Sequence, residues 1–224
     1  MLSWQFVLLG LFAYLLGSVP AAYIAARLSK GIDLRETGSG NVGTSNVARM
    51  TSKILAVPVF MFDIGKGYLV VWLASIAGME LFYQIVIGLL AVIGHNWPVF
   101  LGFKGGRGIA TSLGMVLAVS PWLGVIMIVL AFSLFPFKHL ALGVLIALTA
   151  LPLLAWFVAS PLGISDRTGA FFGFLLLFII VVIRRLTPPR SEISLHTPIG
   201  ELLVNRLLFD RDIRSREAWV NRNS

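Results

Sequence analysis

Long apolar stretches alternate with short polar ones along most of the chain, a pattern typical of an α-helical protein that crosses a membrane several times. Seven apolar segments stand out, at residues 4–26, 54–77, 81–94, 109–119, 122–135, 140–158 and 169–183. Because about 20 residues are needed to cross the hydrocarbon core, the fourth and fifth segments are short. We predict an all-α polytopic membrane protein with seven transmembrane helices, two of them short, over residues 1–186. The alternative joins the fourth and fifth segments into one span broken at Pro121, which gives six.

The positions of Lys and Arg favour seven spans, because these residues are enriched in cytoplasmic loops. With the N-terminus outside, the loop 27–53, Lys104, Arg107 and Lys138 lie inside, together with the arginines after residue 183; only Arg167 lies outside. Six spans would place Lys138 and the arginine-rich tail outside. We therefore predict an N-out, C-in orientation. The first segment lacks a basic start and a small-residue cleavage site, so we expect it to be retained as a span.

The tail, residues 187–224, forms a second, cytoplasmic unit in this interpretation. Thr187 and the two prolines after it end the last span. Residues 197–221 carry apolar positions between charges, which favours an amphipathic helix lying on the cytoplasmic leaflet. A helix that binds a partner protein is the alternative.

The amino-acid composition excludes several kinds of functional site. The chain has 224 residues, a mean hydropathy of +0.90, a formal net charge of +8 and no cysteine. The missing cysteines exclude disulfides, a thiol nucleophile and a cysteine-based metal site. The positive charge fits cytoplasmic loops that face anionic lipid, and we expect no nucleic-acid binding.

The first polar constellation, residues 38–49, is rich in glycine and ends in Arg49. The segment carries hydroxyl groups, side-chain amides and glycines, which together could surround an anion. These residues are Ser39, Gly40, Asn41, Gly43, Thr44 and Asn46. Arg49 adds a planar cation that matches phosphate. We interpret this segment as a cytoplasmic phosphate site; a simple turn with an ordinary cytoplasmic arginine is the alternative.

The second constellation, residues 94–111, also falls on the predicted cytoplasmic side. Lys104 and Arg107 flank Gly105 and Gly106, just before a short helix that includes Thr111. Cations, glycine amides and a helix N-terminus together favour a second phosphate cradle. His95 and Asn96 precede it as candidates for handling or orienting a proton, or as plain interfacial polar residues.

The third constellation places Asp63 and Lys66 inside the second apolar segment. Charges within a span are costly unless they are paired, and a spacing of three residues puts both on one helical face. We predict a structural ion pair, with a catalytic role as the alternative. Gly17 to Pro20 is expected to kink the first helix.

These motifs resemble the bacterial acyl-phosphate: glycerol-3-phosphate acyltransferase family. The loop from Gly38 to Arg49 matches that family's first motif throughout, and the stretch from Gly94 to Thr111 matches its second, with Arg107 where the family usually has lysine. The resemblance covers about residues 1–186. At the end of the last span the family usually carries histidine and asparagine, and here the chain reads Ile183-Arg184-Arg185-Leu186.

The resemblance implies a multi-pass enzyme of the bacterial inner membrane, with its active site at the cytoplasmic face. It would transfer a fatty acyl group from acyl-phosphate to the 1-hydroxyl of glycerol-3-phosphate, giving lysophosphatidic acid and phosphate, with no metal or cofactor. His95, Asn96, Lys104 and Arg49 would be catalytic, and the enzyme that supplies acyl-phosphate would be a partner. Two alternatives are a transporter of a phosphorylated small molecule and an inactive relative that binds acyl lipids.

Overall fold

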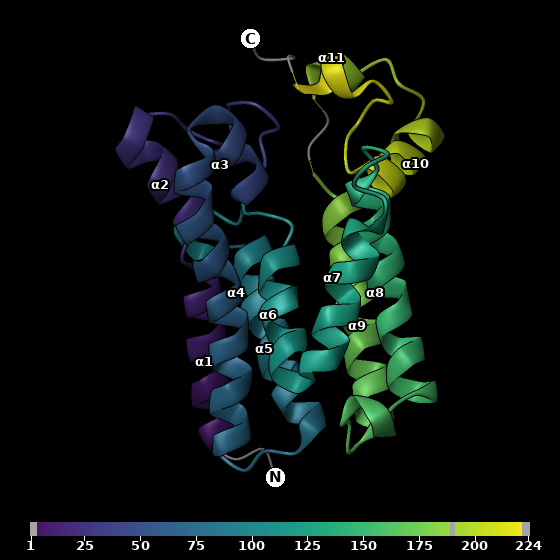
Figure 1. The fold of residues 1–224 in the computed structure, drawn as a ribbon. Helices are drawn as coiled ribbons and strands as arrows, with labels where there is room; N and C mark the ends of the chain where they lie inside the picture. The colour runs from purple at the N-terminus through teal and green to yellow at the C-terminus, as the bar shows by residue number, and fades with distance from the viewer. Residues whose placement is uncertain (1–3, 189–190, 221–224) are drawn as a thin grey trace.

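The computed structural model describes residues 4–188 and 191–220, and every regular element there is helical (Figure 1). The elements in chain order are α1 (Trp4–Ser18), α2 (Ala21–Lys30), α3 (Thr44–Met50), α4 (Lys53–Ile76), α5 (Leu81–Asn96), η1 (Val99–Leu101), α6 (Ile109–Val119), α7 (Pro121–Ser133), α8 (Leu140–Phe157), η2 (Ser160–Leu162), α9 (Arg167–Leu186), η3 (Glu192–Ser194), α10 (Ile199–Phe209) and α11 (Arg216–Val220). The prediction of an all-α protein is confirmed.

Five helical stretches are long and apolar enough to cross a membrane: Trp4–Lys30, Lys53–Ile76, Leu81–Leu101, Leu140–Phe157 and Arg167–Leu186. The first is broken where Val19 and Pro20 separate α1 from α2, because Pro20 has no N–H to continue the helical ladder. The protein is therefore a multi-pass membrane protein. The number of seven crossings and the N-out orientation stay predictions.

The two short helices α6 and α7 are separate and run in opposite directions (Figure 1). The turn between them is Ser120, whose Oγ accepts the N–H of Leu123 at 3.2 Å and thereby caps α7. The same hydroxyl donates to the carbonyl of Leu162 at 2.6 Å, so η2 is tied to the turn. This arrangement agrees with two short segments and not with one interrupted span.

Glycine lets neighbouring helices approach at several crossings, which is how helices associate in lipid, where apolar burial does not drive them together. A Cβ on Gly17 would collide with the backbone of Ala91, so α1 and α5 touch main chain to main chain. A Cβ on Gly67 or Gly114 would do the same between α4 and α6. These contacts hold the helices that carry the polar motifs close together.

The polar loops gather at one end of the bundle. The loop before α3, the loop before α6, the α7–α8 connection and the tail all lie at the end where α9 finishes (Figure 1). The apolar core lies between the helices and includes fully buried Phe174, Ile85 and Leu148. The bundle therefore presents its site-forming segments on one face.

Candidate functional site

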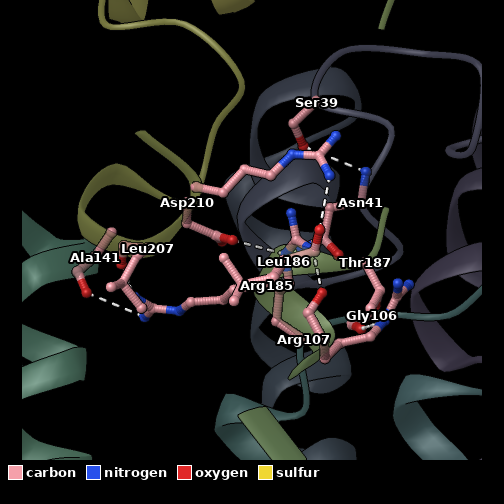
Figure 2. Close-up of polar contacts among 12 residues, drawn as sticks. Ser39, Asn41, Gly106, Arg107, Ala141, Arg185, Leu186, Thr187, Leu207 and Asp210 are labelled. Carbon is pink, nitrogen blue, oxygen red and sulfur yellow. Dashed lines mark hydrogen bonds and ion pairs between the residues drawn. The ribbon is translucent and has the colours of Figure 1, made fainter. Parts of the chain in front are cut away.

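The first glycine-rich loop is shaped by a buried asparagine. The Asn46 side-chain oxygen accepts the N–H of Ser39 at 3.1 Å, and its amide nitrogen donates to the carbonyls of Leu34 and Thr37 at 3.2 and 2.9 Å. Asn46 is 1% exposed, so it holds the loop from within, whereas we predicted that it would bind phosphate. Ser39 and Asn41, which Figure 2 labels, are the two side chains of the loop that line the polar cavity described below.

The second glycine-rich loop is held from both sides. The N–H groups of Gly105 and Gly106 donate to the carbonyls of Asn96 and His95 at 3.3 and 3.1 Å. We expected these amides to be available to a phosphate, but both are bonded within the protein. The carbonyls of the same two glycines accept from Arg184, at 2.6 Å from Nη2 and 2.9 Å from Nε. The loop therefore bridges α5 and the end of α9.

A polar cavity of about 410 Å³ lies between these loops. Its bundle side is lined by Arg35, Ser39, Gly40, Asn41, Gly105, Arg107 and Arg184. Three guanidinium groups border one space, which favours an anionic ligand with planar oxygen groups. The tail forms the opposite wall.

Arg35 is oriented by its neighbour Asp33. The two side chains form an ion pair at 2.6 Å, and hydrogen bonds from Arg35 hold the pKa of the Asp33 carboxyl below its ordinary value. Asp33 thus stays ionised and keeps Arg35 at the rim of the polar cavity.

A second cavity, of about 510 Å³, is mainly apolar and opens between helices. Its walls come from α3, α4, α6, α7 and α8, and include Phe60, Leu113, Met127 and Phe132. Asn41 and Arg107 line both cavities, whereas the other lining residues border one cavity each. The two spaces therefore meet at residues suited to a phosphate.

A buried polar cluster lies beside the apolar cavity. Asp63 and Lys66 form an ion pair at 2.8 Å, so the predicted contact is present. His95 joins them: its Nδ1 lies 2.9 Å from Lys66 Nζ and 3.4 Å from Asp63 Oδ1. Lys66 also donates to the carbonyl of Gly17 at 2.9 Å, at the break between α1 and α2. The sequence indicated the pair but not the third member.

Several other predicted residues lie away from the polar cavity. Arg49 and Lys104 are exposed, and neither borders either cavity. Asn96 is fully buried at the end of α5, and Thr111 is fully buried in the first turn of α6. Gly43 and Thr44 line the apolar cavity. Direct contact of Arg49 and Lys104 with phosphate stays a prediction.

Four residues at the cavities were not among the predicted site residues: Arg184, Arg185, Asp210 and Asp212. The two arginines were explained by the bias of basic residues towards the cytoplasm, and the two carboxylates lie in the tail. In the structure Arg185 is 2% exposed and donates to the carbonyls of Leu207 and Ala141 at 2.9 and 3.0 Å (Figure 2). A paired arginine at the end of an apolar helix was the signal that could have identified them.

The tail packs on the bundle. The helix α10 lies against α8 and α9 with Leu202 and Asn205 buried, while Ile199 and Val204 face outward. In the described part of the chain no three His, Asp or Glu side chains gather where they could hold a metal ion.

These features define a membrane-embedded helical protein in which a cavity lined by arginines meets an apolar cavity. Comparison with known proteins gives the family. The sequence profile described as glycerol-3-phosphate acyltransferase matches residues 7–190. The chain belongs to this family, and it is an acyltransferase of the membrane.

Relatives and solved structures agree. Glycerol-3-phosphate acyltransferase 4 of Dehalococcoides mccartyi (strain CBDB1) is 46% identical over 94% of this chain and 91% of its own length. Glycerol-3-phosphate acyltransferase 5 of another strain of that species (ATCC BAA-2266 / KCTC 15142 / 195) is 44% identical over 100% and 96%. The crystal structure of PlsY (YgiH), an integral membrane glycerol 3-phosphate acyltransferase, in its glycerol 3-phosphate form superposes with a TM-score of 0.73 at 35% identity, covering 81% of this chain and 88% of that one.

Proposed function

We propose that this protein transfers a fatty acyl group from acyl-phosphate to the 1-hydroxyl of glycerol-3-phosphate in phospholipid synthesis, releasing lysophosphatidic acid and inorganic phosphate. One observation carries the proposal: a cationic cavity and an apolar cavity share Asn41 and Arg107. The cationic space suits glycerol-3-phosphate, and the apolar space suits an acyl chain whose activated end must meet it.

The chemistry needs positioning and charge neutralisation. The acceptor oxygen forms a bond to the acyl carbon, the bond from that carbon to the phosphate oxygen breaks, and phosphate leaves with the electron pair. The acceptor proton passes to the leaving phosphate or to a nearby base, for which His95 is our candidate because it borders the apolar cavity. Acyl-phosphate is already activated, so no covalent acyl-enzyme is required.

Roles follow for the residues that line the cavities. Arg35, Arg107 and Arg184 would neutralise phosphate charge, while Ser39 and Asn41 would donate to phosphate oxygens. Arg49 and Lys104, which are exposed, would guide anions towards the opening. The site would face the cytoplasm of the bacterial inner membrane, and an enzyme that makes acyl-phosphate would supply the donor.

The test uses purified protein in a lipid mesophase with palmitoyl-phosphate and glycerol-3-phosphate. Phosphate release is followed, and lysophosphatidic acid is identified by mass; parallel reactions receive palmitoyl-CoA as the donor, or no acceptor. We expect product with acyl-phosphate alone among the donors, and only when the acceptor is present. Product from palmitoyl-CoA at a similar rate would contradict the donor.

Variants separate the two groups of cations. Arg107→Ala and Arg184→Ala should abolish turnover with the fold retained, and Arg49→Ala and Lys104→Ala should lower it. No product from folded protein that binds acyl-phosphate would favour the inactive relative, and counterflow of glycerol-3-phosphate in vesicles would favour the transporter. Against a transporter, the cationic residues of the site gather at one end of the bundle.

A further inference from the structure

The tail forms one wall of the polar cavity. Ser191, Glu192, Ile193, Asp212 and Trp219 border the space that Arg35, Arg107 and Arg184 border from the bundle side. All five lie beyond residue 190, where the match to the family profile ends. The acceptor cavity of this chain is therefore completed by a segment that the family motifs do not include.

The tail is held in place by buried charged groups. Arg206 Nε lies 2.8 Å from Asp212 Oδ1, and each of these side chains is 5% exposed. The other oxygen of Asp212 accepts the N–H and the hydroxyl of Ser191 at 3.0 and 2.8 Å and the hydroxyl of Ser194 at 2.9 Å. Arg206 Nη1 also donates to the carbonyl of Leu186 at 2.8 Å, which joins this unit to the end of α9.

Asp210 projects from this unit to the place where the two cavities meet. It ends α10 with a left-handed backbone at φ 55°, and its Oδ1 lies 2.8 Å from Nε of Arg107 (Figure 2). Arg107 Nη1 donates to the carbonyl of Arg184 at 2.8 Å. Two nitrogens of the guanidinium group are thus oriented by the protein.

The third nitrogen of that group, Nη2, makes no hydrogen bond with any residue in 4–188 or 191–220. A phosphate can therefore bind Arg107 without displacing Asp210. The local charge also favours phosphate binding, because the guanidinium groups of Arg107, Arg184 and Arg185 all interact electrostatically with the Asp210 carboxylate and outnumber it.

We propose that Asp210 is a positioning residue for phosphate recognition: it acts through Arg107, whose guanidinium plane it sets towards the shared space of the two cavities. The identity of the ligand as glycerol-3-phosphate rests on the proposed function, whereas the effect on phosphate binding can be measured without turnover. A competing role, in which the carboxylate occupies the phosphate position and blocks it, predicts the opposite sign.

The test compares Asp210→Asn with Glu201→Gln. Asparagine tolerates the left-handed backbone, so the first change removes charge alone. Glu201 is exposed on α10, so its change removes the same charge from the same segment without touching Arg107. Calorimetry with inorganic phosphate and with glycerol-3-phosphate should show binding about tenfold weaker for Asp210→Asn and unchanged for Glu201→Gln. In turnover, the KM for the acceptor should rise more than kcat falls.

A double-mutant cycle separates positioning from a structural role. In an Arg107→Lys background the planar fork is already lost, so Asp210→Asn should add no further weakening. A further loss there, or lost hydrogen-exchange protection of residues 199–209 in Asp210→Asn, would overturn the proposal in favour of a structural role. Binding equal to or tighter than wild type would also overturn it. If wild-type protein binds phosphate but forms no product, the proposed function fails. The comparison of phosphate binding between the variants still tests the positioning role of Asp210.

Discussion

Two buried ion pairs organise this molecule, one inside the bundle and one in the tail. Asp63 and Lys66 lie 2.8 Å apart on α4, and Arg206 and Asp212 lie 2.8 Å apart beyond α9. All four side chains are at most 5% exposed. Charges buried to this degree are stable only when each has its partner and further hydrogen bonds.

The surroundings of the two pairs differ. The bundle pair is shared among three segments, because Lys66 also contacts the carbonyl of Gly17 and the ring of His95. The tail pair is bonded to Ser191 and Ser194 of the tail itself, and Arg206 also donates to the carbonyl of Leu186. We infer that the first pair couples helices across the core, whereas the second determines whether a local unit is folded.

The largest expected effect comes from removing one charge of the bundle pair. Lys66→Met leaves the Asp63 carboxyl buried without its ion-pair partner, and should lower the free energy of unfolding by about 3–5 kcal/mol. Thermal unfolding in detergent measures this. The double variant Asp63→Asn/Lys66→Met should recover part of the loss, because no uncompensated charge remains. A single variant as stable as wild type would show that the pair does not couple the helices.

Breaking the tail pair should have a smaller and local effect. Asp212→Asn leaves Arg206 buried without a full countercharge, and should favour opening of the tail by about 3 kcal/mol. Hydrogen exchange should rise across residues 199–209 and stay at wild-type values in α4 and α5. Asp166→Asn, at the start of α9 and far from the tail, is the matched control for charge loss. An equal rise of hydrogen exchange in α4 and α5 would show that the tail pair does not act on a local unit alone.

A third change tests a polar residue that is buried without charge. Asn46→Ala removes the three hydrogen bonds that hold residues 34–39, and should cost about 2 kcal/mol because the carbonyls and the N–H of the loop lose their partner. The KM for the acceptor should rise, since Ser39 loses its place. Lys53→Gln, at an exposed position at the start of α4 that lines neither cavity, should leave both quantities unchanged. Wild-type KM in Asn46→Ala would mean that the loop keeps its shape without this side chain.

The smallest expected effect is a dependence of the tail on pH. Burial by itself raises the pKa of Asp212, but hydrogen bonds from Arg206, Ser191 and Ser194 hold it below the ordinary value. The carboxylate therefore stabilises the folded tail fully above the unfolded pKa of about 4, and this stabilisation is lost as the pH falls through the lower folded pKa. Hydrogen exchange of residues 199–209, corrected for intrinsic rates, should rise in that range. Asp212→Asn should show no such rise.

The helices of the bundle could be predicted closely from the sequence. The segment at 109–119 coincides with α6, and the segments at 81–94, 122–135, 140–158 and 169–183 differ from the observed helices by at most three residues at either end. Long apolar runs and their breaks are local signals. The Asp63–Lys66 contact was also predictable, because three residues on a helix fix the distance between two side chains.

The contacts between distant segments could not be predicted in the same way. His95 reaches Lys66 only because α5 packs beside α4, and the spacing within either helix carries no information on that. The tail shows the same limit: apolar spacing predicted one amphipathic helix over 197–221, whereas the structure has α10, a reversal at Asp210 and the short α11. Periodicity indicates that a face is apolar but does not say what covers it.

The reversal of the chain at Ser120 determines at which end of the bundle α9 finishes. Because the chain turns back there, α9 finishes at the same end as the loops that contain Asn41 and Gly105. A single straight helix in place of α6 and α7 would lack this reversal, and Arg184 with its tail would arrive at the opposite end of the bundle. The site combines segments as far apart as Asn41 and Arg184, which are 143 residues from each other. Its assembly thus depends on one serine turn that lines neither cavity.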